Sequence, residues 1–238
     1  MRQIPNIITL GNLFCGILGI VFILKYDNIE IASYLLLLGL IFDFSDGLVA
    51  RLLKVSSELG KQLDSLSDLV SFGVLPSCVF FSMMNQMACV DGKCTGLIPS
   101  NLFPYGAFII ALFSAYRLAK FNIDTRQTKE FIGLPTPANA AFIFSIYFLS
   151  KDLGFLNSPK VLMLIAIVFS YLLISEIRLM SLKIDKANRT STIFQVILIG
   201  LALPGIIIFQ WKAVPVILIL FIFLSLVKDY FFSKKDIQ

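Results

Sequence analysis

Long apolar segments recur along almost the whole chain, and they limit its possible folds more than any other feature. Of the 238 residues, 58% are hydrophobic and only 15% are charged, whereas a soluble domain is about 45–50% apolar and about 25% charged. Several of the apolar runs approach the ~20 residues with which an α-helix crosses the hydrocarbon core of a bilayer. The sequence therefore predicts an all-α polytopic membrane protein.

Hydropathy along the chain indicates about eight transmembrane helices joined by short polar connections, with no separate soluble domain. We interpret the first as a retained helix rather than a cleaved signal peptide, because Pro5, Asn6 and Asn12 interrupt its apolar run. The expected spans are 4–24, 31–53, 64–87, 102–122, 136–150, 160–180, 192–210 and 213–232.

The distribution of basic residues predicts the orientation of these spans. If the N-terminus lies inside the cell, 15 of the 20 Lys and Arg residues fall at cytoplasmic ends, as the positive-inside rule requires. We therefore expect a protein of the bacterial cytoplasmic (inner) membrane with both termini in the cytoplasm. The net charge of +5 suits anionic lipids or phosphate-bearing substrates and requires no nucleic acid.

Histidine is absent from the chain. This absence excludes Ser-His-Asp and Cys-His nucleophiles as well as histidine zinc sites. Cys15 and Cys78 lie in apolar runs and are expected to be buried thiols. Cys89 and Cys94 flank a polar turn on the expected outer side of the membrane. The two residues could form a disulfide there or stay as free thiols, and the sequence favours neither.

Four aspartates, Asp43, Asp46, Asp64 and Asp68, lie within the second and third apolar segments. A carboxylate in a membrane helix costs about 2.5–3.5 kcal/mol on insertion, so such residues face a protein interior and usually mark function. Their helical spacing places each pair on one face, and a short turn makes the two helices antiparallel neighbours. Oxygen-only ligands favour Mg²⁺ or Mn²⁺. The pattern therefore predicts a site for one or two such cations.

Small residues accompany these acids. Gly47 and Ala50 share the face of the first aspartate pair, Gly60 shares that of the second, and Arg51 lies at the rim. This combination leaves room for a planar group beside the acids and suits a nucleotide diphosphate bridged by metal. Gly47 and Ala50 alone would more often indicate close helix packing than a substrate site, and a single aspartate pair would fit a helix cap or an ion pair.

The pattern Asp-x-x-Asp-Gly-x-x-Ala-Arg-x8-Gly-x3-Asp-x3-Asp, complete from Asp43 to Asp68, resembles the signature of the CDP-alcohol phosphotransferases. Asn12 stands where we would expect an arginine in the branch that uses glycerol phosphate, which argues against a phosphorylated acceptor. Four further segments resemble the branch of CDP-diacylglycerol–serine O-phosphatidyltransferases: Ile4–Asn12, Ser71–Pro76, Arg117–Asn122 and Gly133–Pro137.

The resemblance implies a six-helix core, which we assign to residues 1–190, followed by an additional helical pair and short tail in 191–238. It also implies a homodimer in the lipid bilayer and two divalent cations, Mg²⁺ or Mn²⁺, held by the four aspartates. Asp68 would be the general base that takes the proton of the serine hydroxyl. The residues implied in nucleotide binding are Gly47, Ala50, Arg51 and Gly60. Thr9 and Asn12 on the first helix are further candidates for contact with the nucleotide or pyrophosphate, and helix packing is an equal alternative for both.

The implied reaction joins CDP-diacylglycerol and L-serine to give phosphatidylserine and CMP, so the site must recognise an amino acid. Arg117, Lys120 and Asn122 lie at the expected cytoplasmic end of the fourth span, and an arginine fork suits a carboxylate. These residues would also serve as ordinary positive-inside anchors. We regard them as candidate acceptor-binding residues.

Three alternatives stay open. The same family contains enzymes with other acceptors, such as glycerol 3-phosphate or inositol phosphate, and enzymes with an archaeal-type lipid donor. A divalent-cation transporter would also use intramembrane aspartates, but it would be expected to distribute them along a path through both halves of the membrane. A membrane scaffold without chemistry would leave the acid cluster unexplained.

Overall fold

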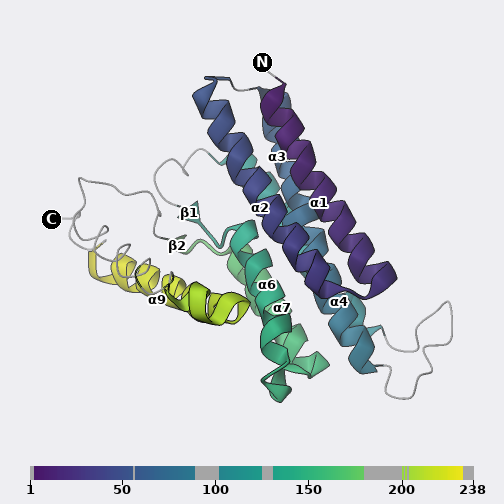
Figure 1. Cartoon of the computed structure of the whole chain (residues 1–238). Coiled ribbons are helices and arrows are strands. Elements are labelled where there is room, and N and C mark those ends of the chain that lie inside the picture. Colours follow the sequence, from purple (N-terminus) through teal and green to yellow (C-terminus); the bar gives the residue numbers. More distant parts are fainter. Residues whose placement is uncertain are drawn as a thin grey trace.

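The computed structural model describes residues 3–55, 57–88, 102–124, 131–179, 200, 202 and 204–232. Within these ranges the protein is a helical bundle (Figure 1). Its longer helices are α1 (Ile4–Tyr26), α2 (Ile29–Leu52), α3 (Glu58–Asp68), α4 (Leu75–Ala88), α5 (Ile109–Ile123), α6 (Thr136–Ser150), α7 (Pro159–Ile174) and α9 (Val214–Phe232). Its short helical segments are η1 (Leu69–Val74), η2 (Phe103–Phe108), η3 (Gly154–Leu156) and η4 (Gln210–Ala213).

Four helical stretches of the described chain are long and apolar enough to cross a membrane, which supports an integral membrane protein. α7 is apolar but shorter. The prediction of eight spans with both termini in the cytoplasm stays a prediction, and most of the seventh expected span lies outside the described residues. So do Cys89 and Cys94, whereas Cys15 and Cys78 are buried and free, as expected. The four stretches are Ile4–Tyr26, Glu58–Met87, Phe103–Ile123 and Pro204–Val227.

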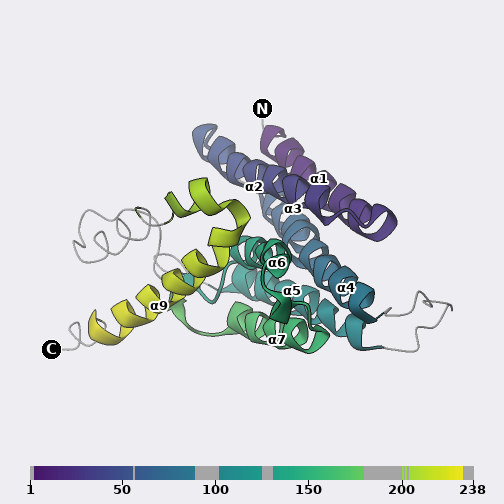
Figure 2. The same cartoon turned by 60° about the horizontal axis from the view of Figure 1, so that its bottom comes forward.

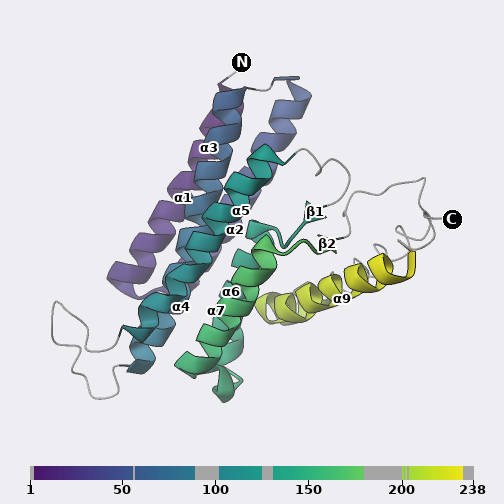
Figure 3. The same ribbon diagram turned by 180° about the vertical axis from the view of Figure 1, so that it is seen from behind.

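Two capped turns set the first three helices side by side. α1 ends at Asp27, whose backbone is left-handed, and the side chain of Asn28 accepts a hydrogen bond from the N–H of Ile31 at the start of α2 (2.9 Å). Ser57 caps α3 by accepting from the N–H of Gly60 (2.9 Å). α1 therefore packs along both α2 and α3 (Figures 1 and 3).

The third span forms the centre of the bundle. It runs through α3, the π-helical η1 and α4 without a break, and 72% of its most apolar window is buried, against 33% for α1. Phe72 and Phe80 of this span are completely buried. A π turn directly after Asp68 changes the helical register there. Such π turns occur frequently at functional sites.

α6 lies between this centre and the C-terminal helix. It packs against α4 on one side and against α9 on the other, as Figure 2 shows. Gly133 precedes it with a φ of +76°, and a Cβ at this position would meet the carbonyl oxygen of Leu173 at 2.6 Å. The chain therefore requires glycine here to bring the start of α6 against the end of α7.

A two-strand antiparallel ladder departs from the all-helical expectation. β1 (Phe131–Ile132) pairs with β2 (Arg178–Leu179). Strands of two residues carry no periodicity that a sequence pattern can reveal. The ladder joins the segment before α6 to the segment after α7.

Candidate functional site

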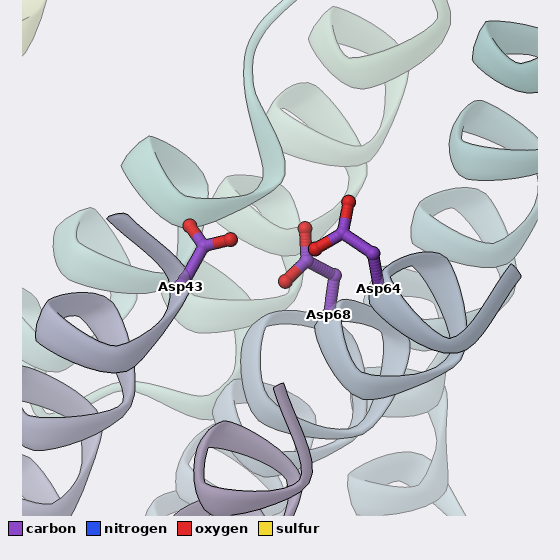
Figure 4. A group of neighbouring side chains, drawn as sticks. All are labelled: Asp43, Asp64 and Asp68. Atoms are coloured by element: carbon purple, nitrogen blue, oxygen red, sulfur yellow. The ribbon is translucent and has the colours of Figure 1, made fainter. Parts of the chain in front are cut away.

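Three of the four predicted aspartates converge in one group. Asp43 reaches in from α2, and Asp64 and Asp68 reach in from α3 (Figure 4). One carboxylate oxygen of each lies within 4.8 Å of the others. Asp68 is buried, and the other two are half-buried. The helical spacing and the antiparallel turn thus bring together three of the four aspartates that the sequence predicts to share one site.

Asp46 lies outside this group and is held by α1. Its Oδ2 accepts a hydrogen bond from the Thr9 hydroxyl (2.6 Å), and the Oδ1 of Asp68 accepts one from the Nδ2 of Asn12 (3.2 Å). Thr9 and Asn12, predicted to bind nucleotide, are thus in contact with the acids themselves. Their side chains are 4% and 0% exposed. One face of α1 therefore positions two of the four carboxylates.

Two serines that sequence reasoning missed fasten this face of α1 to the central span. The hydroxyl of Ser67 donates to the carbonyl oxygen of Thr9 (2.9 Å), and that of Ser71 donates to the carbonyl oxygen of Asn12 (3.0 Å). Gly16 permits the approach, because a Cβ there would overlap Ser71. Both serines share a helix face with Asp64 and Asp68 at i+3 spacing, which is the signal that would have revealed them.

The acid group has the composition of a site for hard divalent cations. Among the residues that the structure describes, no Lys or Arg forms an ion pair with any of the three carboxylates, although three ion pairs occur elsewhere in those residues. Like charges this close repel one another unless a cation lies between them. Oxygen ligands alone fit Mg²⁺ or Mn²⁺. The residues present therefore fit a divalent metal.

A cavity of about 360 Å³ opens beside the acid group. Gly47 faces open space, since a Cβ built there would meet nothing within 4 Å. Arg51 is exposed, and its Nε donates to the carbonyl oxygen of Gly47 (3.0 Å). The cavity brings together most of the small and acidic residues of the signature with others that were not predicted. Its lining includes Gln3, Asn6, Thr9, Asp46, Gly47, Ala50, Ser57, Gly60, Lys61 and Asp64.

Of the three candidate acceptor residues, Arg117 alone is buried beside the acids. It is 8% exposed, and its guanidinium interacts electrostatically with Asp68. Lys120 instead pairs with Glu176 at 3.4 Å. The Nδ2 of Asn122 donates to the Ser65 hydroxyl (2.8 Å). Asn122 therefore tethers α5 to α3, and Arg117 supplies the positive charge near Asp68.

Comparison with known proteins agrees with this geometry. Residues 2–172 match the family model described as CDP-alcohol phosphatidyltransferase. The chain is 34% identical over 180 residues to the CDP-diacylglycerol–serine O-phosphatidyltransferase of Bacillus subtilis, covering 75% of this chain and 90% of that protein. It is 31% identical over 237 residues to the Helicobacter pylori (strain 26695) protein of the same name, covering 98% and 93%.

An archaeal relative is similar over a shorter length. The archaetidylserine synthase of Methanothermobacter thermautotrophicus is 35% identical over 147 residues, which is 60% of this chain and 57% of that protein. The family match includes every helix that contributes to the acid group and its cavity. The chain belongs to the CDP-alcohol phosphatidyltransferase family.

Proposed function

We propose that this enzyme transfers the phosphatidyl group of CDP-diacylglycerol to the hydroxyl of L-serine, giving phosphatidylserine and CMP. The observation that carries the proposal is the position of a buried arginine beside the three-carboxylate group, which itself adjoins a cavity lined by small residues. An amino-acid acceptor needs a partner for its carboxylate, and Arg117 is a suitable one. The names of the bacterial relatives support serine as the acceptor.

Asp43, Asp46, Asp64 and Asp68 would hold two divalent cations, Mg²⁺ or Mn²⁺. When bound, such ions neutralise charge on the pyrophosphate and on the leaving phosphate. Thr9 and Asn12 orient two of the carboxylates toward this task through their hydrogen bonds. Mutation of residues that hydrogen-bond to metal ligands in this way typically lowers metal affinity or activity by about 10–100-fold.

The cavity would receive the cytidine nucleotide. Gly47, Ala50 and Gly60 leave room there for a planar group, and Asp46 and Asp64 also line the cavity. Arg51 lies one helical turn from Gly47, at the exposed end of α2. We assign it to the phosphate at the rim of the cavity.

Asp68 is the proposed general base. Asn12 donates to its Oδ1, so Oδ2 is the oxygen that would take the proton of the serine hydroxyl. The serine oxygen then attacks the phosphorus that bears diacylglycerol, and the bond from this phosphorus to the CMP oxygen breaks. Arg117 would hold the serine carboxylate next to Asp68, which places acceptor and base together.

The remaining assignments follow the family resemblance. We place the enzyme in the bacterial inner membrane as a homodimer with its active site on the cytoplasmic face, and we divide it into a catalytic core (1–190) and a C-terminal helical pair (191–238). The family match ends at residue 172, which agrees with a core in the N-terminal part. Lys120 and Asn122 would contribute to the acceptor site by holding the end of α5.

The deciding experiment measures CMP release by the purified protein in mixed micelles with CDP-diacylglycerol and Mn²⁺ or Mg²⁺. Labelled serine and glycerol 3-phosphate are offered separately. We expect release with serine and none with glycerol 3-phosphate. Equal release from an Asp64→Asn variant, or release with neither acceptor, would refute the proposal.

Two further measurements test the alternatives to this function. The archaeal relative raises the possibility of a different lipid donor, which is tested by replacing CDP-diacylglycerol with CDP-archaeol. A divalent-cation transporter would need acids along the whole path, but the described residues contain one such acid group, confined to one level of the bundle. Metal uptake into proteoliposomes without CMP release would favour transport.

A further inference from the structure

A buried amide on α6 lacks any hydrogen-bond partner among the described residues. Asn139 is 0% exposed, and neither its Oδ1 nor its Nδ2 makes a hydrogen bond. Thr136 lies one helical turn earlier, is 1% exposed and has an unpartnered hydroxyl. Buried polar groups are almost always paired, because an unpaired one destabilises the fold. Two such residues on one face of one helix therefore point to a bound ligand.

The first turn of α6 lies close to the acid group. α6 runs in the same direction as α4, and it packs against both η1 and α4 (Figures 1 and 3). Because η1 precedes α4 in this direction, the start of α6 lies beside η1. η1 begins directly after Asp68. Thr136 and Asn139 therefore lie near the level of Asp68.

Arg117 lies at the same level on α5, which packs against η1. α5 is antiparallel to the central span: Asn122 contacts Ser65, and a Cβ on Gly73 would meet the Cβ of Ser114 at 3.0 Å. Between these two contacts Arg117 interacts with Asp68. The Nε of Arg117 is buried and also lacks a hydrogen-bond partner. α5 and α6 thus both pack against η1, and both carry buried polar groups without a hydrogen-bond partner among the described residues.

We propose that Asn139, assisted by Thr136, is a specificity-determining residue that binds the α-amino acid acceptor. This inference rests on the proposed function. An amide offers one acceptor and two donors, so Oδ1 accepts from the acceptor's ammonium while Nδ2 donates to its carboxylate. Arg117 binds the other carboxylate oxygen. A site whose buried polar groups are satisfied by both groups discriminates against an alcohol that lacks them.

Replacing Asn139 by leucine tests the inference, because leucine has a similar size and needs no partner. We expect Asn139→Leu to raise the KM for serine about 10- to 100-fold, the effect of losing hydrogen bonds to charged groups. The KM for CDP-diacylglycerol should not change, and the thermal midpoint should stay the same or rise. Thr136→Val should raise the serine KM about 3- to 10-fold by the loss of one hydrogen bond.

The matched control is Ser145→Ala, also on α6. Ser145 is equally buried, but its hydroxyl donates to the carbonyl oxygen of Phe142 in its own helix, so the serine KM should not change. A wild-type serine KM in Asn139→Leu would overturn the inference and leave the proposed function intact. A wild-type protein that never uses serine would overturn both. If Asn139→Leu does not fold, Thr136→Val decides, and an unchanged serine KM in that variant overturns the inference.

Discussion

The acid group differs from the acidic residues at the opposite end of the helical bundle. At the end that holds the α1–α2 turn, Asp27 accepts hydrogen bonds from Ser82 and Gln86, Glu30 pairs with Lys151, and Asp152 pairs with Lys212. Toward the other end, the carboxylates of the acid group converge without a basic partner within ion-pair distance. Acids of the first kind are satisfied by the protein itself. Acids of the second kind have no cationic partner within ion-pair distance among the described residues, and a bound metal ion would supply one.

This difference separates charge that stabilises the fold from charge to which we assign a function. The ion pairs at the α1–α2 end are half exposed, and pairs of that kind contribute about 0–1 kcal/mol to stability. The acid group is partly buried and repulsive, so it lowers the stability of the metal-free protein. Substitutions at the two ends should therefore have opposite consequences for activity and stability.

The largest expected effect follows from Asp64→Asn. Asparagine has the same shape but removes one of three converging charges, so CMP release should fall at least about a hundredfold, as it does when a transition-state charge loses its partner. The thermal midpoint of the metal-free protein should rise because repulsion is relieved. Enzyme assay and thermal unfolding of the same preparation measure both quantities. An Asp64→Asn variant that keeps its activity, or whose thermal midpoint falls, would contradict the contrast between the acid group and the ion pairs at the α1–α2 end.

Arg117→Leu should affect the acceptor more than the donor. The arginine is buried and interacts with Asp68, and hydrogen bonds to a charged ligand contribute about 1.5–3 kcal/mol. We expect the KM for serine to rise about 10- to 100-fold, with a small change for CDP-diacylglycerol. Lys120→Leu is the comparison: Lys120 pairs with Glu176 and would act on the acceptor only by holding the end of α5, so the KM for serine should rise less in this variant. Equal effects of the two substitutions would place Arg117 among ordinary membrane anchors.

Much of this site was predictable because its acids obey helical spacing. Asp64 and Asp68 share a helix face at i+4 spacing, and the antiparallel turn brings Asp43 to them. Gly47, Ala50 and Gly60 line the predicted cavity. Our prediction for the start of the third span was wrong, because we expected residue 64 and the helix begins at Glu58. Hydropathy misses this polar first part, which forms because Ser57 caps it.

Other features could not be predicted because they depend on contacts between distant helices. Thr9 and Asn12 were expected at the nucleotide, and their hydrogen bonds to Asp46 and Asp68 appear only when α1 packs on the other two helices. Asn139 gives no signal in the sequence, since a polar residue in an apolar helix usually has a partner. Only the structure shows that this one has none among the described residues.

Thr9→Val tests whether α1 tunes the acid group. Valine keeps the shape of threonine and removes the hydrogen bond to Asp46. We expect the Mn²⁺ concentration for half-maximal activity to rise about tenfold, in the range typical of outer partners of metal ligands. Ser145→Ala is the control, because the Ser145 hydroxyl donates within its own helix and not to an acid. If the Mn²⁺ concentration for half-maximal activity is unchanged in Thr9→Val, Asp46 does not depend on α1 for its orientation.

The smallest expected effect lies at the α1–α2 end. Lys151→Met removes the pair with Glu30 and the contact of the ammonium with the ring of Tyr147, but the methionine side chain keeps much of the apolar packing. Because the pair is half exposed, stability should fall by at most about 1 kcal/mol, and the loss should shrink in high salt. CMP release should not change. A large loss of activity would mean that charges at this end are coupled to the acid group, and the division between the two ends would fail.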